Sequence, residues 1–201
     1  MAARPAAGSG RPRHGGALLD ATRRWGIPVS GWLDLSTGIN PLPYPLPPPA
    51  DDITRRLPDP DALEALNAAA RALYGAPADA AVVAVPGTDI ALRLLPMLEP
   101  RTTVAVLTPT YSGHAEAWGG AGHELRPVGD LDAADDADIV ILANPNNPDG
   151  RRIAPEQLAT FAARPRRLLV VDEAFCDLDP ALSLVPRLSG GAVVLRSFGK
   201  F

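Results

Sequence analysis

The sequence predicts an α/β protein built on an open, largely parallel sheet with helices packed against it. Short runs of β-branched and aliphatic residues alternate with segments whose apolar positions recur at helical spacing. Several runs end in glycine or proline turns, and ligands of open α/β sheets bind at the carboxyl ends of the strands. Two late runs lead to charged residues, Asp172 and Lys200, which we therefore expect at one edge of the sheet.

The composition is that of an ordinary globular chain. Its 201 residues are 46% hydrophobic and 21% charged, with a formal net charge of −4, which favours neither nucleic acid nor membrane as a partner. Cys176 is the only cysteine, no apolar run reaches the ~20 residues of a membrane span, and the start lacks a signal-peptide core. His114 and His123 have no partners at metal-ligand spacing, so we predict surface histidines and no metal site. We expect a cytoplasmic protein.

Residues 1–60 are expected to precede the main domain. Residues 1–13 are small, basic and rich in proline and glycine, which favours disorder. The remainder, 14–60, is predicted to be an arm with a helix ending at Gly26 and a short strand and turn across 32–41. Within it, His14 and Asn40 either make local hydrogen bonds or reach into a site.

The main domain, 61–201, is predicted to begin with a helix that Asp61 caps and Gly75 ends. A strand at 81–85, a tight turn and a helix at 90–98 follow. Free backbone N–H groups in such a turn, with the positive end of the helix dipole, bind anions such as phosphate. Similar turns also occur without ligands, so the motif alone leaves both interpretations open.

The rest of the chain repeats the alternation of strand and helix. The predicted elements are strands at 103–107, 137–143, 168–172 and 192–196, with helices at 112–118, 155–163 and 180–188. Tyr111 lies between a strand and a helix, where its ring either stacks on a planar ligand or fills the core edge. Two Asn-Pro pairs within 144–150 favour a rigid turn that holds an amide toward a ligand over a plain connection.

The pairing of Asp172 with Lys200 suggests one specific chemistry. A lysine amine can form a Schiff base with pyridoxal phosphate, while a carboxylate holds the pyridine nitrogen protonated. Alone, the pair is weak evidence, because strands that end in aspartate are common and a lone lysine near a terminus is usually solvated.

Five motifs, taken together and in order, resemble the fold type I pyridoxal-phosphate enzymes of the class I/II aminotransferase group. They are Gly87-Thr88-Asp89, Tyr111, Asn144-Pro145-Asn146-Asn147-Pro148-Asp149-Gly150, Asp172-Glu173-Ala174-Phe175 and Ser197-x-x-Lys200. The resemblance implies a pyridoxal 5'-phosphate cofactor, and it assigns each matching residue a role. The phosphate would bind to Gly87, Thr88, Asp89 and Ser197, the ring to Tyr111, Asn147 and Asp172, and the aldehyde carbon to Lys200.

The N-terminal passage narrows the resemblance. His14-Gly15-Gly16, the run from Trp32 to Pro41 and Arg56-Leu57-Pro58-Asp59-Pro60 are similar to the threonine-phosphate decarboxylases of cobalamin biosynthesis, relatives of histidinol-phosphate aminotransferase. This implies loss of CO2 from L-threonine O-3-phosphate to give (R)-1-amino-2-propanol O-phosphate. It also implies that the substrate, a small phosphorylated amino acid, lies near His14, Gly15, Asn40 and Asn147. The family further implies a homodimer.

Three departures from the family pattern matter. Phe175 and Leu57 stand where many relatives have tyrosines that contact the cofactor. The Gly-x-Arg segment expected beyond the lysine does not follow Phe201, so we expect a truncated chain without its C-terminal small domain. Two alternatives therefore stay open, a histidinol-phosphate-type aminotransferase and an inactive fragment.

Overall fold

The computed structural model describes residues 15–27 and 31–201. The chain divides into two compact units, Met1–Pro41 and Leu42–Phe201. The predicted disorder of residues 1–13 and the predicted role of His14 lie outside the described residues. The domain boundary predicted at residue 60 stays a prediction.

The described part of the first unit is built on one short helix. Helix α1 (Leu18–Trp25) ends at Gly26, whose φ of 67° is the left-handed conformation that glycine adopts readily, as the sequence predicted. The Trp32 indole donates to Thr22 Oγ1 and to the Ile27 carbonyl, both at 3.1 Å. The strand predicted across 32–41 is wrong, because these residues are irregular and pair with no strand in the part of the chain that the structure describes.

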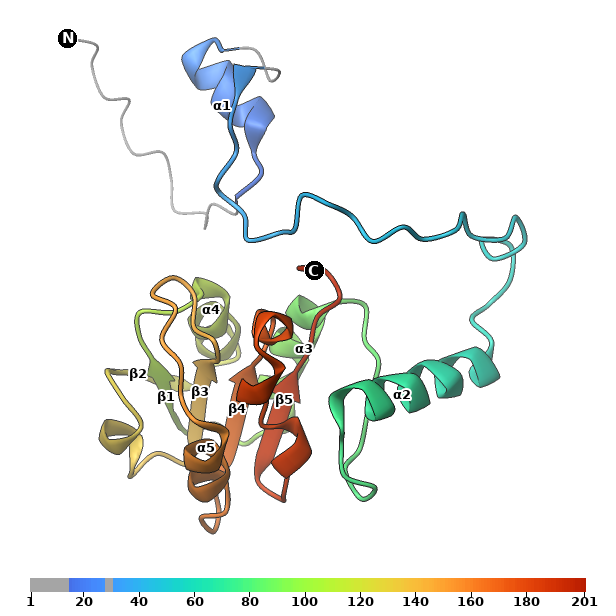
Figure 1. Ribbon diagram of the computed structural model, residues 1–201. Helices are drawn as coiled ribbons and strands as arrows, with labels where there is room; N and C mark the ends of the chain where they lie inside the picture. Colours follow the sequence, from blue (N-terminus) through green and yellow to red (C-terminus); the bar gives the residue numbers. More distant parts are fainter. Residues whose placement is uncertain (1–14, 28–30) are drawn as a thin grey trace, which may run out of the picture. The chain divides into compact units, whose positions relative to one another are not determined.

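The second unit contains a five-stranded, fully parallel sheet in the order β2-β1-β3-β4-β5 (Figure 1). Its strands are β1 (Thr103–Leu107), β2 (Glu124–Val128), β3 (Ile139–Ala143), β4 (Leu168–Asp172) and β5 (Ala192–Leu195). Helices pack against both faces, so the predicted α/β fold class is confirmed. No helix among residues 15–27 and 31–201 is long and apolar enough to cross a membrane.

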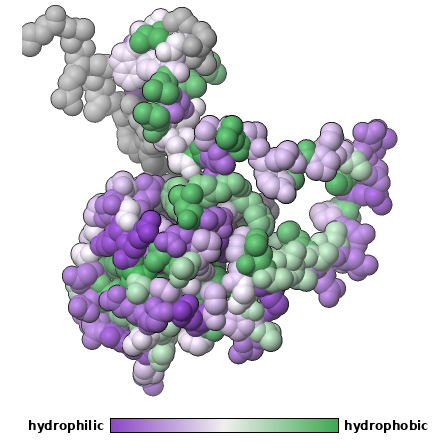
Figure 2. Space-filling view, viewed as in Figure 1, coloured by the Kyte–Doolittle hydropathy of each residue, from purple (hydrophilic) through white to green (hydrophobic). Residues whose placement is uncertain are grey.

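Helices and 3-10 turns precede and connect these strands. They are α2 (Pro60–Tyr74), α3 (Thr88–Leu94), α4 (Ser112–Gly120) and α5 (Pro155–Ala162), with 3-10 turns η2 (Leu95–Leu98), η3 (Asp132–Ala134), η4 (Cys176–Leu178), η5 (Pro180–Leu182) and η6 (Val185–Arg187). Figure 2 shows apolar residues exposed along α2, where Leu73 is 72% exposed.

Successive strand residues enter two separate cores, as the pleat of a strand requires. On one face, Val106 and Ile141 pack with Trp118 of α4 and with α3. On the other face, Leu142 and its neighbours pack with Leu158 of α5. Every residue of β3 is buried, which explains why this strand is apolar throughout rather than alternating.

The predicted bounds of several elements differ from the structure. Asp59, not Asp61, caps α2, because its Oδ1 accepts the Asp61 N–H at 3.0 Å and leaves Pro60 as the first helical residue. The helix ends at Gly75 with φ 65°, as predicted. The helix predicted across 180–188 is two 3-10 turns instead, since Pro186 lacks the N–H that a continuous helix would need.

One predicted strand does not form, and one strand of the sheet was not predicted. Residues 81–85 form no strand, and Val83 is 74% exposed, because no described segment lies beside them to share backbone hydrogen bonds. Strand β2 was missed because it is polar and contains Pro127. It is an edge strand, the position in a sheet that tolerates proline.

Candidate active site

The sheet has a topological switch point between β1 and β3. From β1 the chain adds β2 on one side, and it then adds β3, β4 and β5 on the other. Ligands of open α/β sheets bind at such a point, outside the carboxyl ends of the strands. The two loops that flank it, 108–111 after β1 and 144–150 after β3, are joined by hydrogen bonds. Thr110 Oγ1 donates to Asn146 Oδ1 at 2.9 Å, and Asn146 Nδ2 donates to the Pro109 carbonyl at 2.7 Å.

Two asparagines hold the loop after β3. Asn144 is fully buried, donates to the Ile153 carbonyl at 3.0 Å and accepts the Ile153 N–H at 2.9 Å. Asn146 also donates to Asp149 Oδ1, and the Arg151 N–H and this amide together hold the pKa of Asp149 below its usual value. Asn147 is exposed, and among the described residues no hydrogen bond of its amide is recorded. The loop is therefore fixed by its neighbours while Asn147 faces outward.

Asp172 ends β4 and has a buried partner. Its Oδ2 lies 3.0 Å from Nε2 of His114, whose ring is fully buried, and its Oδ1 accepts the Ala174 N–H at 3.0 Å. The prediction that His114 and His123 are surface residues is wrong. His114 lies three residues after Tyr111 in the first turn of α4, so both residues share the helix face that meets the sheet. His123 packs on Trp118 and contacts the Pro96 carbonyl at 2.9 Å.

Tyr111 lies beside this carboxylate–histidine pair. Its ring meets the His114 ring edge-on, with centroids 5.7 Å apart, and packs partly against the core beneath α4. Burial raises the pKa of the Tyr111 phenol, and the carboxylates of Asp89 and Glu116 raise it further, so the hydroxyl stays protonated at neutral pH. The ring is half-buried, so part of its surface stays accessible.

Lys200 is the only lysine in a chain that carries eighteen arginines, and this rarity is a signal in the sequence that singles it out. Its Nζ lies 5.4 Å from the centroid of the ring of Phe175, a residue of the turn that follows Asp172. Ser197 Oγ accepts the Gly199 N–H at 3.1 Å, which bends the segment after β5. The lysine amine therefore lies near the turn that follows β4.

The turn before α3 presents backbone donors. Gly87 has φ 95° and ψ 150°, a conformation that is almost restricted to glycine. The N–H groups of Thr88 and Asp89 begin the helix and have no acceptor within it. The Asp89 carboxylate accepts from Arg93 Nε at 2.9 Å. The two N–H groups are thus the donors that this turn can offer to an anion.

Gly15 and Asn40, two of the predicted substrate residues, belong to the first unit. A Cβ added to Gly15 would lie 2.0 Å from the Ser36 carbonyl oxygen, and the Gly16 N–H donates to Ser36 Oγ at 2.8 Å. This close approach explains the Gly-Gly pair locally. Contact of Gly15 or Asn40 with a substrate stays a prediction.

Comparisons with known proteins agree on a family. A family model described as aminotransferase class I and II matches residues 49–201. A threonine-phosphate decarboxylase of Pseudomonas aeruginosa is 43% identical over 195 residues, which cover 94% of this chain and 57% of that protein. Histidinol-phosphate aminotransferase 3 of Mesorhizobium japonicum is 32% identical, over 86% of this chain and 52% of that protein. The chain thus spans a little over half the length of these curated relatives.

Solved structures share the fold. L-threonine-O-3-phosphate decarboxylase from Porphyromonas gingivalis matches with a TM-score of 0.62 at 20% identity, over 74% of this chain and 50% of that one. Histidinol-phosphate aminotransferase from Sinorhizobium meliloti, solved in complex with pyridoxal-5'-phosphate, matches with a TM-score of 0.51 at 28% identity. This second match covers 57% of this chain and 36% of that one.

Proposed function

The chain belongs to the class I and II aminotransferase family, and from this premise we propose that it forms the cofactor-binding part of a pyridoxal-phosphate-dependent decarboxylase of L-threonine O-3-phosphate. The observation that carries the cofactor is the gathering of an aromatic face, a buried carboxylate and the only lysine at one edge of the sheet. The observation that carries the substrate is the 43% identity to threonine-phosphate decarboxylases over 94% of the chain.

The edge residues fit this cofactor by their chemistry. Tyr111 offers part of an aromatic face, Asp172 a carboxylate for the ring nitrogen, and Lys200 an amine for the aldehyde carbon. Bound to a lysine, pyridoxal phosphate withdraws electrons from the Cα of an amino-acid substrate. A carboxylate beside the ring nitrogen keeps that nitrogen protonated by charge pairing, which strengthens the withdrawal.

His114 would orient the carboxylate. Its ring is sealed from water and contacts one oxygen of Asp172, while the Ala174 N–H binds the other, so the carboxylate has little freedom to rotate. A carboxylate held in this way loses little conformational entropy when it contacts a ring nitrogen, because it is already oriented.

The phosphate would bind at the start of α3. The N–H groups of Thr88 and Asp89 are free of helical acceptors, and the helix dipole favours an anion there. The Ser197 hydroxyl would add a further donor, and the exposed amide of Asn147 would bind the ring hydroxyl. These four assignments rest on the resemblance, and the observed donors support them.

The reaction breaks the bond between Cα and the carboxylate carbon, releases CO2 and returns a proton to Cα. The Lys200 amine would be the group that carries this proton. A transaminase removes the Cα proton instead, so the two reactions differ in which bond to Cα the site must orient for cleavage. The histidinol-phosphate alternative is supported by 32% identity over 86% of the chain.

The first prediction tests the substrate. The full-length protein, loaded with pyridoxal phosphate and given L-threonine O-3-phosphate, should release CO2 and aminopropanol phosphate in equal amounts. A Lys200→Ala variant is the control and should release neither. Amino transfer from histidinol phosphate to 2-oxoglutarate, without CO2 release from threonine phosphate, would establish the aminotransferase instead.

A further inference from the structure

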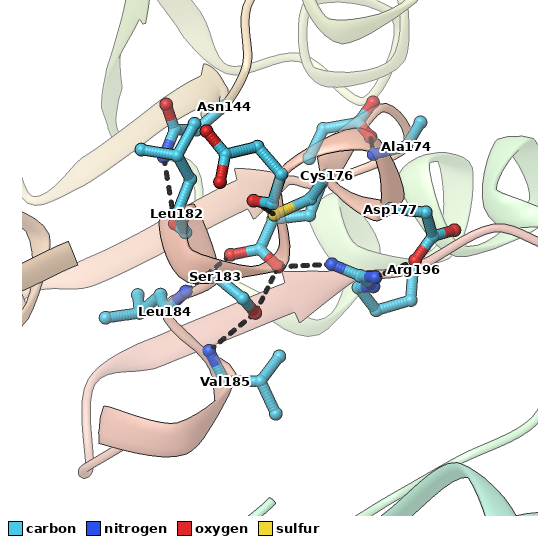
Figure 3. Close-up of polar contacts among 12 residues, drawn as sticks. Asn144, Ala174, Cys176, Asp177, Leu182, Ser183, Leu184, Val185 and Arg196 are labelled. Atoms are coloured by element: carbon cyan, nitrogen blue, oxygen red, sulfur yellow. Dashed lines mark hydrogen bonds and ion pairs between the residues drawn. The ribbon is translucent and has the colours of Figure 1, made fainter. Parts of the chain in front are cut away.

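A buried ion pair joins the ends of β4 and β5 on the side of the sheet away from Asp172. Glu173 is 1% exposed, and its carboxylate accepts the Leu184 N–H at 2.7 Å, the Ser183 hydroxyl at 2.7 Å and Arg196 Nη1 at 2.9 Å. Figure 3 shows Ser183, Leu184 and Arg196 converging on this point. Both oxygens of this carboxylate therefore accept hydrogen bonds from neighbouring donors.

Arg196 is held on its other sides as well. Its second terminal nitrogen binds Asp177, and its guanidinium lies over the Tyr74 ring at 4.4 Å from the centroid. Burial opposes the charge of Arg196, yet its hydrogen bond to Glu173 and the nearby carboxylates keep its pKa above the usual value. Arg196 therefore stays charged, and its contacts restrict the positions that its guanidinium can take.

The alternation of side chains along a strand links this pair to the site. Asp172 points to the α4 face, where it meets His114, so Glu173, the next residue, points to the opposite face. In the same way Leu195 packs in the core beneath α4, and Arg196 turns to the side of Glu173. Each member of the pair is therefore the chain neighbour of a residue assigned to the cofactor, Asp172 on one strand and Ser197 on the other.

An apolar pair could join the two strands at a lower cost in free energy. Burying two charges removes their hydration, and the attraction between them offsets that loss only when their geometry is good. What the ionic pair adds is direction. The fork of a guanidinium accepts only certain positions of its partners, so it fixes the strand ends in register and in orientation. The backbone confirms the register, since the Glu173 N–H donates to the Leu195 carbonyl at 2.9 Å.

We propose that Glu173 and Arg196 are positioning residues: they fix the segment 197–200, which carries the lysine amine, relative to the carboxylate of Asp172. The relevance of this pair to catalysis rests on the proposed function, whereas the ordering of the segment can be measured without cofactor. The competing interpretation is that the pair only stabilises the turns η4 to η6, to which Ser183 and Leu184 connect.

The test compares Glu173→Gln and Arg196→Lys with a control, Leu158→Ala, in the full-length protein. Glu173→Gln removes the negative charge, and Arg196→Lys removes the planar guanidinium, while both keep a side chain of similar size. The control removes buried volume from the core beneath α5, a cluster that includes neither Glu173 nor Arg196. It should lower stability without removing any hydrogen bond of the pair.

Two measurements are made on each variant. Without cofactor, hydrogen exchange is followed in the peptide that contains residues 196–200. With pyridoxal phosphate bound, the pH titration of its visible absorbance band is recorded. We expect both pair variants to speed exchange in this peptide by about tenfold and to move the titration midpoint, while Leu158→Ala changes neither.

Unchanged exchange in residues 196–200, or equal acceleration in the control, would overturn the proposal, whatever the loss of stability. A local acceleration with an unmoved titration midpoint would also overturn it, because the pair would then not set the geometry at the cofactor. If the wild type gains no visible band at all, the proposed function fails, and the exchange experiment alone decides whether the pair orders the segment.

Discussion

At the scale of single residues, the most informative finding is that His114 is buried, although the sequence predicted it at the surface. We expected His114 at the surface because it has no metal-ligand partner, but its ring is buried against Asp172 at 3.0 Å. The signal that could have placed it is its position three residues after Tyr111, which puts both on one helix face. A histidine without metal-ligand partners can therefore still be buried as the hydrogen-bond partner of a carboxylate.

The second prediction compares the two buried histidines. His114→Phe removes the hydrogen bond to Asp172, and His123→Phe removes those to the Pro96 carbonyl and from the Thr102 N–H. Each change should lower the free energy of unfolding in urea by about 1 to 3 kcal/mol. Only His114→Phe should also weaken pyridoxal phosphate, by about tenfold in a fluorescence titration. Equal cofactor affinity in the two variants would contradict the orienting role of His114.

At the scale of elements, sequence prediction succeeded where burial was complete. The bounds of β1 and β4 were predicted to the residue, because a strand buried on both faces is a continuous apolar run with polar flanks. It failed at 81–85, an equally apolar run, because a strand also needs a neighbour and the sequence does not say which segments pair.

The turns at the edge of the sheet were predicted as candidate ligand sites. The hydrogen bonds that hold these turns in place were not predicted. Glycine and the Asn-Pro pairs mark the turns before α3 and after β3 locally. The bonds of Asn146 to Pro109 and Thr110 span more than thirty residues of sequence, so only the folded chain reveals them. The same holds for Glu173 and Arg196, which are twenty-three residues apart.

The third prediction concerns the turn before α3. Gly87→Ala should cost about 1 to 3 kcal/mol, because an added Cβ meets nothing within 4 Å and only the φ of 95° opposes it. It should also weaken pyridoxal phosphate through the misplaced N–H groups. Gly120→Ala, at the end of α4 in equally open space, is the control and should leave the urea midpoint and the affinity nearly unchanged. Identical behaviour of the two variants would argue against the strained turn.

At the scale of the whole molecule, the fold class follows from the alternation of apolar runs and helical spacing, and the sheet confirms it. The order of the strands does not follow from the sequence, yet it decides where the site lies, because the switch point between β1 and β3 is a property of topology. The homodimer and the substrate contacts of the first unit stay predictions, since they depend on parts of the assembly that a single chain does not specify.

The central claim is that Lys200 holds pyridoxal phosphate at the edge of this sheet. It is tested most directly by adding the cofactor to the full-length protein, reducing with borohydride and mapping the modified peptide by mass spectrometry. We predict one pyridoxyl phosphate group per chain, attached to Lys200, and none when the Lys200→Ala variant is treated in the same way. A modification at another amine with Lys200 left unmodified, or no stable modification in the wild type, would contradict the account.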